Sequence, residues 1–275
     1  MNIDQLATNA ILGENDIWKT PAAKNVSYTI NGHELIKEKE KNSFWFSHRL
    51  ECLKKVIASS PIETTIDIGG GNGEFSKYLQ SIGIETLLLE PGIQGAINAN
   101  ENGIENIING SLMDAGFIDS AFHSAVLLDV LEHIECDKKF LAEIFRILKP
   151  GGKLIITVPA FQFLFSSFDK EVGHYRRYTL NSLSKKLSDT GFTMDYKTYF
   201  FSFLPLPIVI GRLLINRFKS EKNRKSTGHI NKYSVLGRLF RFLLFPEKLI
   251  IKQKIKIPFG SSCLVVVHKP ETYEK

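Results

Sequence analysis

The sequence lacks several features that would define its class at once. Only three of its 275 residues are cysteines, Cys52, Cys136 and Cys263, and they are far apart without CxxC spacing. This pattern predicts a reducing, cytoplasmic environment and argues against a disulfide framework and a zinc site. No run approaches 18 consecutive apolar residues, and the opening MNIDQLATNA has no basic cluster followed by an apolar segment. We therefore expect neither a membrane-spanning helix nor a secretory signal.

Acidic residues are scarce in one segment. Between residues 201 and 258 the chain carries 13 lysines and arginines, and its only acids there are Glu221 and Glu247, so the local charge is +11. The remainder has 22 basic and 27 acidic residues, a charge of −5, although the whole chain is +6. We expect a mildly acidic body that carries one strongly basic segment.

Apolar strand-like runs alternate with helix-like runs from residue 61 to residue 200. The strand-like runs are rich in Ile, Leu and Val and show no polar alternation, which predicts a parallel sheet covered on both faces. The expected strands are TTIDI, IETLLLE, IENIIN, FHSAVLLD and KLIITVP, with SSCLVVVHK as a late final strand. Helices are expected between them, one of which begins after Thr179 as its N-cap. The sequence therefore predicts a doubly wound α/β fold.

This alternation divides the chain into four parts. Residues 34–59 are charged, then aromatic, then apolar at helical spacing, which predicts one or two helices ending before Pro61. The expected parts are a loosely ordered leader with a helical lid (1–60), the sheet domain (61–200), a basic amphipathic helical insertion (201–258), and the final strand with a tail (259–275).

Glycines concentrate directly after the first expected strand. The segment DIGGGNG places four of them within positions 69 to 73, preceded by Asp67. A glycine-rich turn between a strand and a helix lets the backbone approach a ligand closely. The GxGxxG pattern fits poorly, because Glu74 or Ser76 occupies its third glycine position. Glu90 closes the second strand, where a carboxylate can accept hydrogen bonds from two ribose hydroxyls.

With these landmarks the sequence resembles the class I S-adenosylmethionine-dependent methyltransferases. The resemblance rests on DIGGGNG, LLLEPG, NGSLMD and LLDVLEHI, followed by RILKPGGKLIITVP, in that order. A GHYRRYT stretch further resembles a bacterial subgroup of that family. The family resemblance implies a mostly parallel, seven-stranded Rossmann-like sheet that ends in an antiparallel strand. It also implies S-adenosyl-L-methionine as cofactor and S-adenosylhomocysteine as product.

The resemblance also assigns residues to the cofactor. The backbone of the glycine turn is expected to lie against the methionine part, Asp67 to help hold its amino-acid group, and Glu90 to take the ribose hydroxyls. Ser111 occupies a place where many relatives have an aspartate near the adenine, and Asp114 is a nearby carboxylate that can substitute. The expected cofactor-binding residues are Asp67, Gly69, Gly70, Gly71, Gly73, Glu90, Pro91, Ser111, Leu112 and Asp129.

Two stretches are candidates for binding the methyl acceptor. EVGHYRRYT follows the fifth strand, where loops line the crevice of an open α/β sheet, and its histidine suits a general base. Its arginines suit a carboxylate or phosphate, or they only fix the loop through Asp169 or Glu171. NSFWFSHRL is either an aromatic lid over a sulfonium or the apolar face of a docking helix. The expected acceptor-side residues are Trp45, Arg49, His133, Tyr175, Arg176 and Arg177, with His174 as the catalytic base.

No metal ion is expected, because methyl transfer from a sulfonium does not require one and the seven histidines show no HExxH or other tight ligand spacing.

The basic segment leaves three interpretations open. In VLGRLFRFLLF, apolar residues recur at helical spacing with Arg238 and Arg241 off that stripe, which is typical of helices in anionic membrane interfaces. The same helices can instead cap the active site, or contact nucleic acid through their charge. Nucleic acid is the least favoured partner, because the aromatic residues follow the apolar stripes.

We therefore predict a cytoplasmic enzyme, membrane-associated if the basic segment contacts lipid. It methylates an oxygen or nitrogen of a small-molecule or lipid-linked acceptor by in-line displacement. One alternative is a nicotinamide-dependent oxidoreductase on a similar sheet. Another is a non-catalytic protein that binds membrane or nucleic acid and keeps a vestigial methyltransferase fold. The sequence makes no prediction of oligomeric state.

Overall fold

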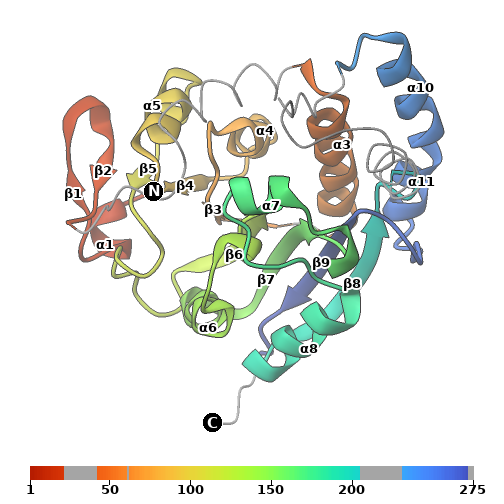
Figure 1. Ribbon diagram of the computed structural model, residues 1–275. Coiled ribbons are helices and arrows are strands. Elements are labelled where there is room, and N and C mark those ends of the chain that lie inside the picture. Colours follow the sequence, from red (N-terminus) through yellow and green to blue (C-terminus); the bar gives the residue numbers. More distant parts are fainter. Residues whose placement is uncertain (22–41, 61, 205–230, 272–275) are drawn as a thin grey trace.

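The computed structural model describes residues 1–21, 42–60, 62–204 and 231–271. In these ranges the chain forms one nine-stranded sheet with helices on both faces, as expected for a doubly wound α/β protein (Figure 1). The strand order is β1-β2-β5-β4-β3-β6-β7-β9-β8. β3 therefore lies in the middle of the sheet, and later strands are added on either side of it.

Five parallel strands form the centre of the sheet. They are buried along most of their length because helices cover both faces, which explains why their sequences show no polar alternation. Neighbouring strands stay in register, with Ile66 opposite Leu87 on one side and Ala125 on the other. The five strands are β3 (Thr65–Ile68), β4 (Thr86–Glu90), β5 (Ile107–Asn109), β6 (Phe122–Leu128) and β7 (Leu148–Pro159).

Two antiparallel strands complete one edge of the sheet. β9 (Ser262–His268) lies between β7 and β8 (Thr193–Phe200) and is antiparallel to both. The expected late strand is therefore confirmed. It pairs with β8, although residues 201–261 separate the two strands in the sequence.

The seven-stranded expectation is wrong in number, because the first residues of the chain add two short strands. They form α1 (Ile3–Leu6), β1 (Ile11–Leu12), η1 (Glu14–Asp16) and β2 (Trp18–Lys19). β2 pairs in parallel with β5, and the side chain of Ile17 is buried. Thr20 packs so closely on Gly110 that a Cβ there would lie 2.4 Å from the Thr20 hydroxyl oxygen. Residues 1–21 are thus an ordered edge of the sheet, and the loosely ordered leader expected there is not found.

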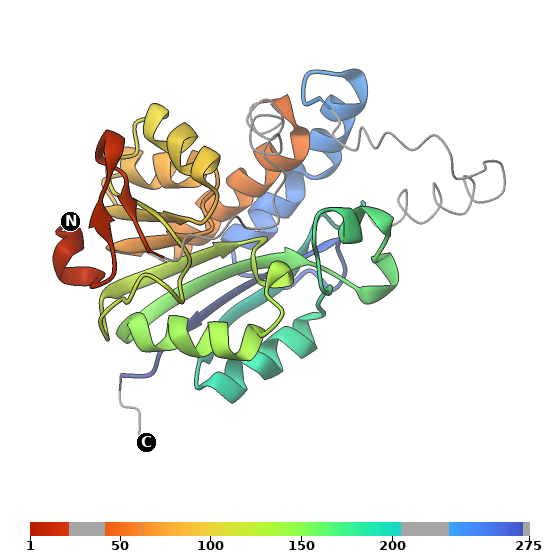
Figure 2. The same ribbon diagram turned by 60° about the vertical axis from the view of Figure 1, so that its left-hand side comes forward.

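Helices cover the two faces of the sheet in separate groups (Figure 2). On β6, Ala125 and Leu127 face α6 and α8, whereas Val126 faces α3, α4 and α11. The Thr179 hydroxyl accepts a hydrogen bond from the Ser182 N–H, which confirms the expected N-cap of α8. The helices are α3 (Phe44–Ser59), α4 (Glu74–Ser81), α5 (Ile93–Glu101), α6 (Asp137–Ile147) and α8 (Leu180–Thr190), with the short η2 (Leu131–His133), η3 (Gln162–Leu164) and α7 (Ser167–Glu171).

The described part of the basic insertion consists of two helices, α10 (Val235–Leu243) and α11 (Phe245–Lys252). They pack against α3: the rings of Phe44 and Phe240 stack with 5.3 Å between centroids, and Leu244 is fully buried. Residues 205–230 of the expected insertion and 22–41 of the expected leader and helices lie outside the described residues. Each helix of the described ranges is too short or too polar to cross a lipid bilayer.

Candidate functional site

The glycine turn joins β3 to α4 at the carboxyl edge of the sheet. Gly69, Gly71 and Gly73 have φ angles of +71°, +57° and +80°, which side chains rarely adopt. A Cβ on Gly69 would lie 2.6 Å from the Val130 side chain, so this glycine is required by packing. A Cβ on Gly71 would meet no atom within 4 Å. The turn therefore presents bare backbone to open space at its centre, as a close-approaching ligand requires.

Two carboxylates flank this turn. Glu90, at the end of β4, accepts hydrogen bonds from the N–H groups of Gly71 (2.8 Å) and Gly92 (2.7 Å). Asp67 is 1% exposed and accepts a hydrogen bond of 2.7 Å from the Ser76 hydroxyl. Burial raises the pKa of Asp67 to about 6, opposed by that hydrogen bond and by the charge of Arg49. Glu90 is thus fixed beside the turn, and its binding of a ribose stays a prediction.

The segment after β5 lies beside the end of β4. Ser111 donates a 2.6 Å hydrogen bond to Asp114, so the two side chains that were expected near the adenine form one unit. The Asn109 amide donates to the carbonyl oxygens of Glu90 and Pro91 and so ties this segment to the end of β4. The side chain of Leu112 is buried and belongs to the core of the sheet.

Asp129 follows β6 with a φ angle of +56°. Its carboxylate accepts hydrogen bonds from Arg49 (2.5 Å) and from the Thr157 hydroxyl (3.2 Å). The Arg49 guanidinium in turn lies over the rings of Trp45 (4.8 Å) and Phe46 (5.1 Å). Arg49, which the sequence places on the acceptor side, is therefore in contact with a residue expected to bind the cofactor.

The helix α3 that carries Arg49 is also a docking helix. The Trp45 ring stacks on Phe201 at 5.3 Å, and His48 is buried against Glu247 of α11 at 2.5 Å. The apolar-face interpretation of this stretch is confirmed, and a contact between Trp45 and the acceptor stays a prediction.

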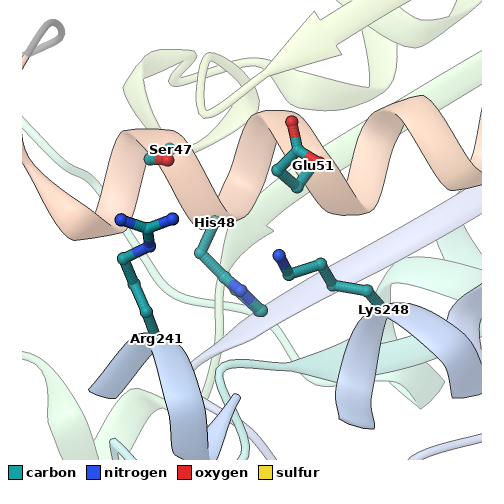
Figure 3. A pocket seen from close by; sticks show the side chains of 5 residues that line it. All are labelled: Ser47, His48, Glu51, Arg241 and Lys248. Atoms are coloured by element: carbon teal, nitrogen blue, oxygen red, sulfur yellow. The ribbon is translucent and has the colours of Figure 1, made fainter. Parts of the chain in front are cut away.

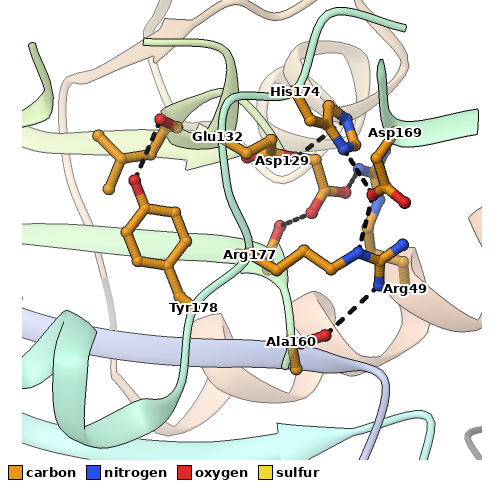
Figure 4. Close-up of polar contacts among 10 residues, drawn as sticks. Arg49, Asp129, Glu132, Ala160, Asp169, His174, Arg177 and Tyr178 are labelled. Carbon is orange, nitrogen blue, oxygen red and sulfur yellow. Dashed lines mark hydrogen bonds and ion pairs between the residues drawn. The ribbon is translucent and has the colours of Figure 1, made fainter. Parts of the chain in front are cut away.

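The arginines of the GHYRRYT stretch bind carboxylates of the protein body, and Figure 4 shows the contact of Arg177 with Asp169. Arg177 donates to Asp169 at 2.7 Å and Arg176 to Asp137 at 3.1 Å, and the Tyr178 hydroxyl also donates to Asp137. Burial would raise the pKa of Asp169, but hydrogen bonds from His174 and Arg177 outweigh it and hold that pKa below its usual range. The loop-fixing alternative is therefore supported for both arginines, and their binding of an acceptor stays a prediction.

His174 and His133 meet at the same edge. His174 Nδ1 lies 3.0 Å from Asp169, and the two imidazole rings are T-shaped with 4.6 Å between centroids. Burial, and then the neighbouring His174, lowers the pKa of His133 to about 4. Tyr175, which follows His174 in the sequence, is 52% exposed.

Glu132 was missed by sequence reasoning, and it lies between these groups. It is 1% exposed, and neither of its carboxylate oxygens has a hydrogen-bond partner among the described residues. His174 Nε2 is 3.9 Å from its Oε1 (Figure 4). Burial, and then the charge of Asp129, raises the pKa of Glu132 well above its ordinary value. The signal available in the sequence was its place next to His133, three residues after Asp129, directly beyond a buried strand.

A small polar cavity of about 140 Å³ lies elsewhere, on the side of α3 that faces α10 and α11 (Figure 3). Its lining residues are Ser47, His48, Glu51, Arg241 and Lys248. It lies between α3 and the basic insertion and includes none of the turn residues and not His174.

Residues 66–156 match the sequence model of the family described as "Methyltransferase domain". The match runs from β3 into β7 and includes the glycine turn, Glu90 and Asp129. This segment is therefore similar to the domains of that family, over less than half of the chain. The GHYRRYT stretch lies beyond it, so the subgroup stays a prediction.

Several known proteins are similar to this chain in sequence or in structure. The ubiquinone/menaquinone biosynthesis C-methyltransferase UbiE of Haemophilus ducreyi is 28% identical over 133 residues, which are 45% of this chain and 50% of that protein. A SAM-dependent methyltransferase from Archaeoglobus fulgidus has a TM-score of 0.58 at 16% identity, with 86% of this chain and 99% of that chain covered. Phosphoethanolamine N-methyltransferase 2 of Haemonchus contortus, in complex with S-adenosyl-L-methionine, has a TM-score of 0.56 at 18% identity, with 90% and 58% covered.

The solved structures establish the Rossmann-like methyltransferase fold. The chain spans about half or less of the length of the curated relatives it matches.

Proposed function

We propose that this protein is an S-adenosylmethionine-dependent methyltransferase that acts on a small-molecule or lipid-linked acceptor. The observation that supports this most is Glu90, held by two backbone N–H groups beside a glycine turn whose central residue, Gly71, faces open space. The matched domain and the fold support the same activity.

In this proposal the chain supplies a complete set of contacts for the cofactor. S-adenosylmethionine, when bound, supplies a methyl group activated by a sulfonium. Glu90 accepts hydrogen bonds from the ribose hydroxyls, and the Ser111–Asp114 pair lies where the adenine amine is expected. Asp67 lies near the end of β3 and Asp129 directly follows the neighbouring β6, and in this proposal the two carboxylates bind the amino-acid part from two sides. Arg49, paired with Asp129, brings a positive charge to the same place.

His174 is the proposed catalytic base on the acceptor side. Asp169 holds Nδ1 of the imidazole, so Nε2 points towards Glu132. A histidine oriented in this way can take a proton from an acceptor hydroxyl or ammonium group during methyl transfer. His133 and the exposed Tyr175 lie beside it and line the same edge.

The exposed side of α10 supports a lipid-linked acceptor. Val235 and Phe242 are 79% and 77% exposed, and Leu239 is 50% exposed, while Arg238 and Arg241 are exposed on the same short helix. Apolar side chains beside arginines suit the interface of an anionic membrane. We therefore favour peripheral membrane contact by α10 over a purely water-soluble cap. The relatives named above methylate different acceptor types by their names, so they leave the acceptor atom open.

Calorimetric titration of the purified protein with S-adenosylhomocysteine tests the activity class, with NADH as the competing ligand. The wild type should bind S-adenosylhomocysteine and not NADH. Glu90→Gln should weaken binding about ten- to a hundredfold, because hydrogen bonds to a charged group contribute about 1.5–3 kcal/mol. Glu105→Gln, an exposed glutamate outside the site, serves as the control and should bind as the wild type does. NADH binding without S-adenosylhomocysteine binding would refute the proposal.

A further inference from the structure

Three side-chain atoms of the kind that metals prefer as ligands lie close together, in Glu132, His133 and His174. One carboxylate oxygen of Glu132 and one ring nitrogen of each histidine all lie within 4.8 Å of one another. Nε2 of His174 and Oε1 of Glu132 are 3.9 Å apart. Two ligand atoms that each lie about 2.1 Å from a tetrahedral metal ion are about 3.4 Å apart. Small side-chain rotations are therefore enough to bind an ion.

Glu132 itself indicates a cation. Its side chain is buried, and both oxygens lack a hydrogen-bond partner among the residues the structure describes. A buried carboxylate normally has hydrogen bonds, a paired cation or a metal. Nε2 of the His174 imidazole lies 3.9 Å from one of these oxygens. That distance is too long for a hydrogen bond.

Both histidines are oriented by other groups, as metal ligands usually are. Asp169 binds Nδ1 of His174 at 3.0 Å and is itself fixed by Arg177 and Ser166. The backbone of Gly173 hydrogen-bonds the ring of His133. A carboxylate on the far nitrogen of a ligating histidine sets its tautomer and raises its basicity. Nε2 of His174 is thereby left pointing at Glu132.

A second group of similar composition serves as an internal comparison. His48, Cys52 and Glu247 are all buried and close together. There, however, Glu247 accepts hydrogen bonds from the N–H groups of Phe201 and Ser202 and contacts His48 directly at 2.5 Å. Its oxygens are satisfied and no space remains between the ligand atoms. That group links α3, α11 and β8, and we assign it no ion.

We propose that Glu132, His133 and His174 bind one divalent transition-metal ion, and that the ion holds the acceptor group for methylation. Two imidazoles and one carboxylate favour zinc, iron, manganese or cobalt over magnesium and calcium. Three protein ligands leave further positions open, which an acceptor oxygen or nitrogen can occupy. No metal was expected from the sequence, because the ligands come from two segments 41 positions apart without a short motif.

This proposal rests on the proposed methyltransferase function and changes the role of one residue. When the ion is bound, the Nε2 lone pair of His174 is used for ligation, and an acceptor hydroxyl on the ion gives its proton to solvent. The oxygen then forms the new bond to the methyl carbon, the bond from that carbon to sulfur breaks, and its electron pair stays on sulfur. His174 acts as a base only in the metal-free protein.

The test uses the full chain, stripped with a chelator and titrated with Co²⁺ while its visible absorption is recorded. Binding of S-adenosylhomocysteine is measured on the same sample by calorimetry. We expect one Co²⁺ per chain in the wild type, and at least tenfold weaker uptake by Glu132→Gln, His133→Gln and His174→Ala. Cys52→Ser removes a ligand of the comparison group, and His268→Gln removes a histidine far from the site. Both should bind Co²⁺ as the wild type does.

Each outcome bears on one proposal. A wild type that binds S-adenosylhomocysteine but takes up no Co²⁺, Zn²⁺ or Mn²⁺ overturns the metal site and leaves the methyltransferase function standing. A wild type that binds Co²⁺ but not S-adenosylhomocysteine overturns the methyltransferase function and leaves the metal site standing. Co²⁺ uptake that persists in both His133→Gln and His174→Ala also overturns the assignment. So does a thiolate charge-transfer band in the wild type together with loss of uptake in Cys52→Ser. Melting curves identify any variant that fails to fold, and the remaining two ligand variants then decide.

Discussion

Nη1 of Arg49 lies 2.5 Å from Oδ2 of Asp129, although 80 positions separate the two residues in the sequence. Their side chains are only 15% and 19% exposed, and the guanidinium rests on the ring of Trp45. The pair joins α3 to the carboxyl end of β6. α3 therefore contacts the segment that follows β6 as well as its packing partners α10 and α11.

The first prediction concerns this pair. Arg49→Ala and Asp129→Asn should each weaken S-adenosylhomocysteine binding about tenfold or more, because each leaves a partly buried charge without its partner. In a double-mutant cycle the two changes should couple by about 1 kcal/mol, as contacting charged residues do. Lys55→Ala, on the same helix, is the control. Calorimetric affinities that are strictly additive would show that the two residues act independently.

The second prediction concerns the open face of Gly71. Gly71→Ala should lower the free energy of unfolding by about 1 kcal/mol, because alanine is strained at positive φ. It should also abolish measurable S-adenosylhomocysteine binding, because the methyl group occupies the space in front of the turn. Gly83→Ala is a matched control: its φ is +81° and a Cβ there meets no atom within 4 Å, but it lies after α4, away from the turn. Equal loss of affinity in both variants would count against a ligand at Gly71.

The third prediction concerns pH. Asp67 has a folded pKa of about 6 against a reference value of 3.8, so it binds more protons in the folded protein between these values. The free energy of unfolding should therefore fall as pH rises from about 4 to about 6. The two-unit difference corresponds to at most about 3 kcal/mol.

Urea unfolding at pH 4, 5, 6 and 7 measures the free energy of unfolding of the wild type and of Asp67→Asn. The wild type should lose stability relative to the variant as the pH rises across that range. Asp189→Asn, an exposed aspartate, should differ from the wild type by a constant amount. A pH-independent difference for Asp67→Asn would mean that the carboxylate remains ionised throughout.

The fourth prediction concerns α10. The wild type should co-sediment with vesicles containing anionic lipid, less so at high salt, and Phe242→Glu should reduce the bound fraction severalfold, because it places a negative charge on the most exposed apolar ring of the helix. Ile11→Glu changes a similarly exposed apolar residue on β1 and should bind as the wild type does. Absence of binding to any vesicle would direct the search for acceptors to water-soluble metabolites.

The sequence predicts those parts of the molecule whose signal is local. The glycine turn, Glu90 and the cap at Thr179 depend on spacings of a few residues, and the structure places each as expected. Buried parallel strands are also predictable, because their continuous apolar runs follow from burial on both faces.

Features that depend on distant contacts were not predictable. β1 and β2 have two residues each, too few for any periodic pattern, and β2 is a strand because β5 offers it a free edge. Glu132 has the appearance of an ordinary polar residue after a strand, and only its meeting with His174 sets it apart. The arginines of GHYRRYT resemble anion-binding residues because nothing local shows that Asp137 and Asp169 already bind them.

The position of β9 has a consequence for synthesis of the chain. β8 has no partner in the described sheet other than β9, which also separates it from β7. While residues 262–268 are still inside the ribosome, β7 and β8 both lack β9, the strand that pairs with each of them in the described sheet. The nascent protein is therefore most prone to aggregate in the interval just before its last strand emerges.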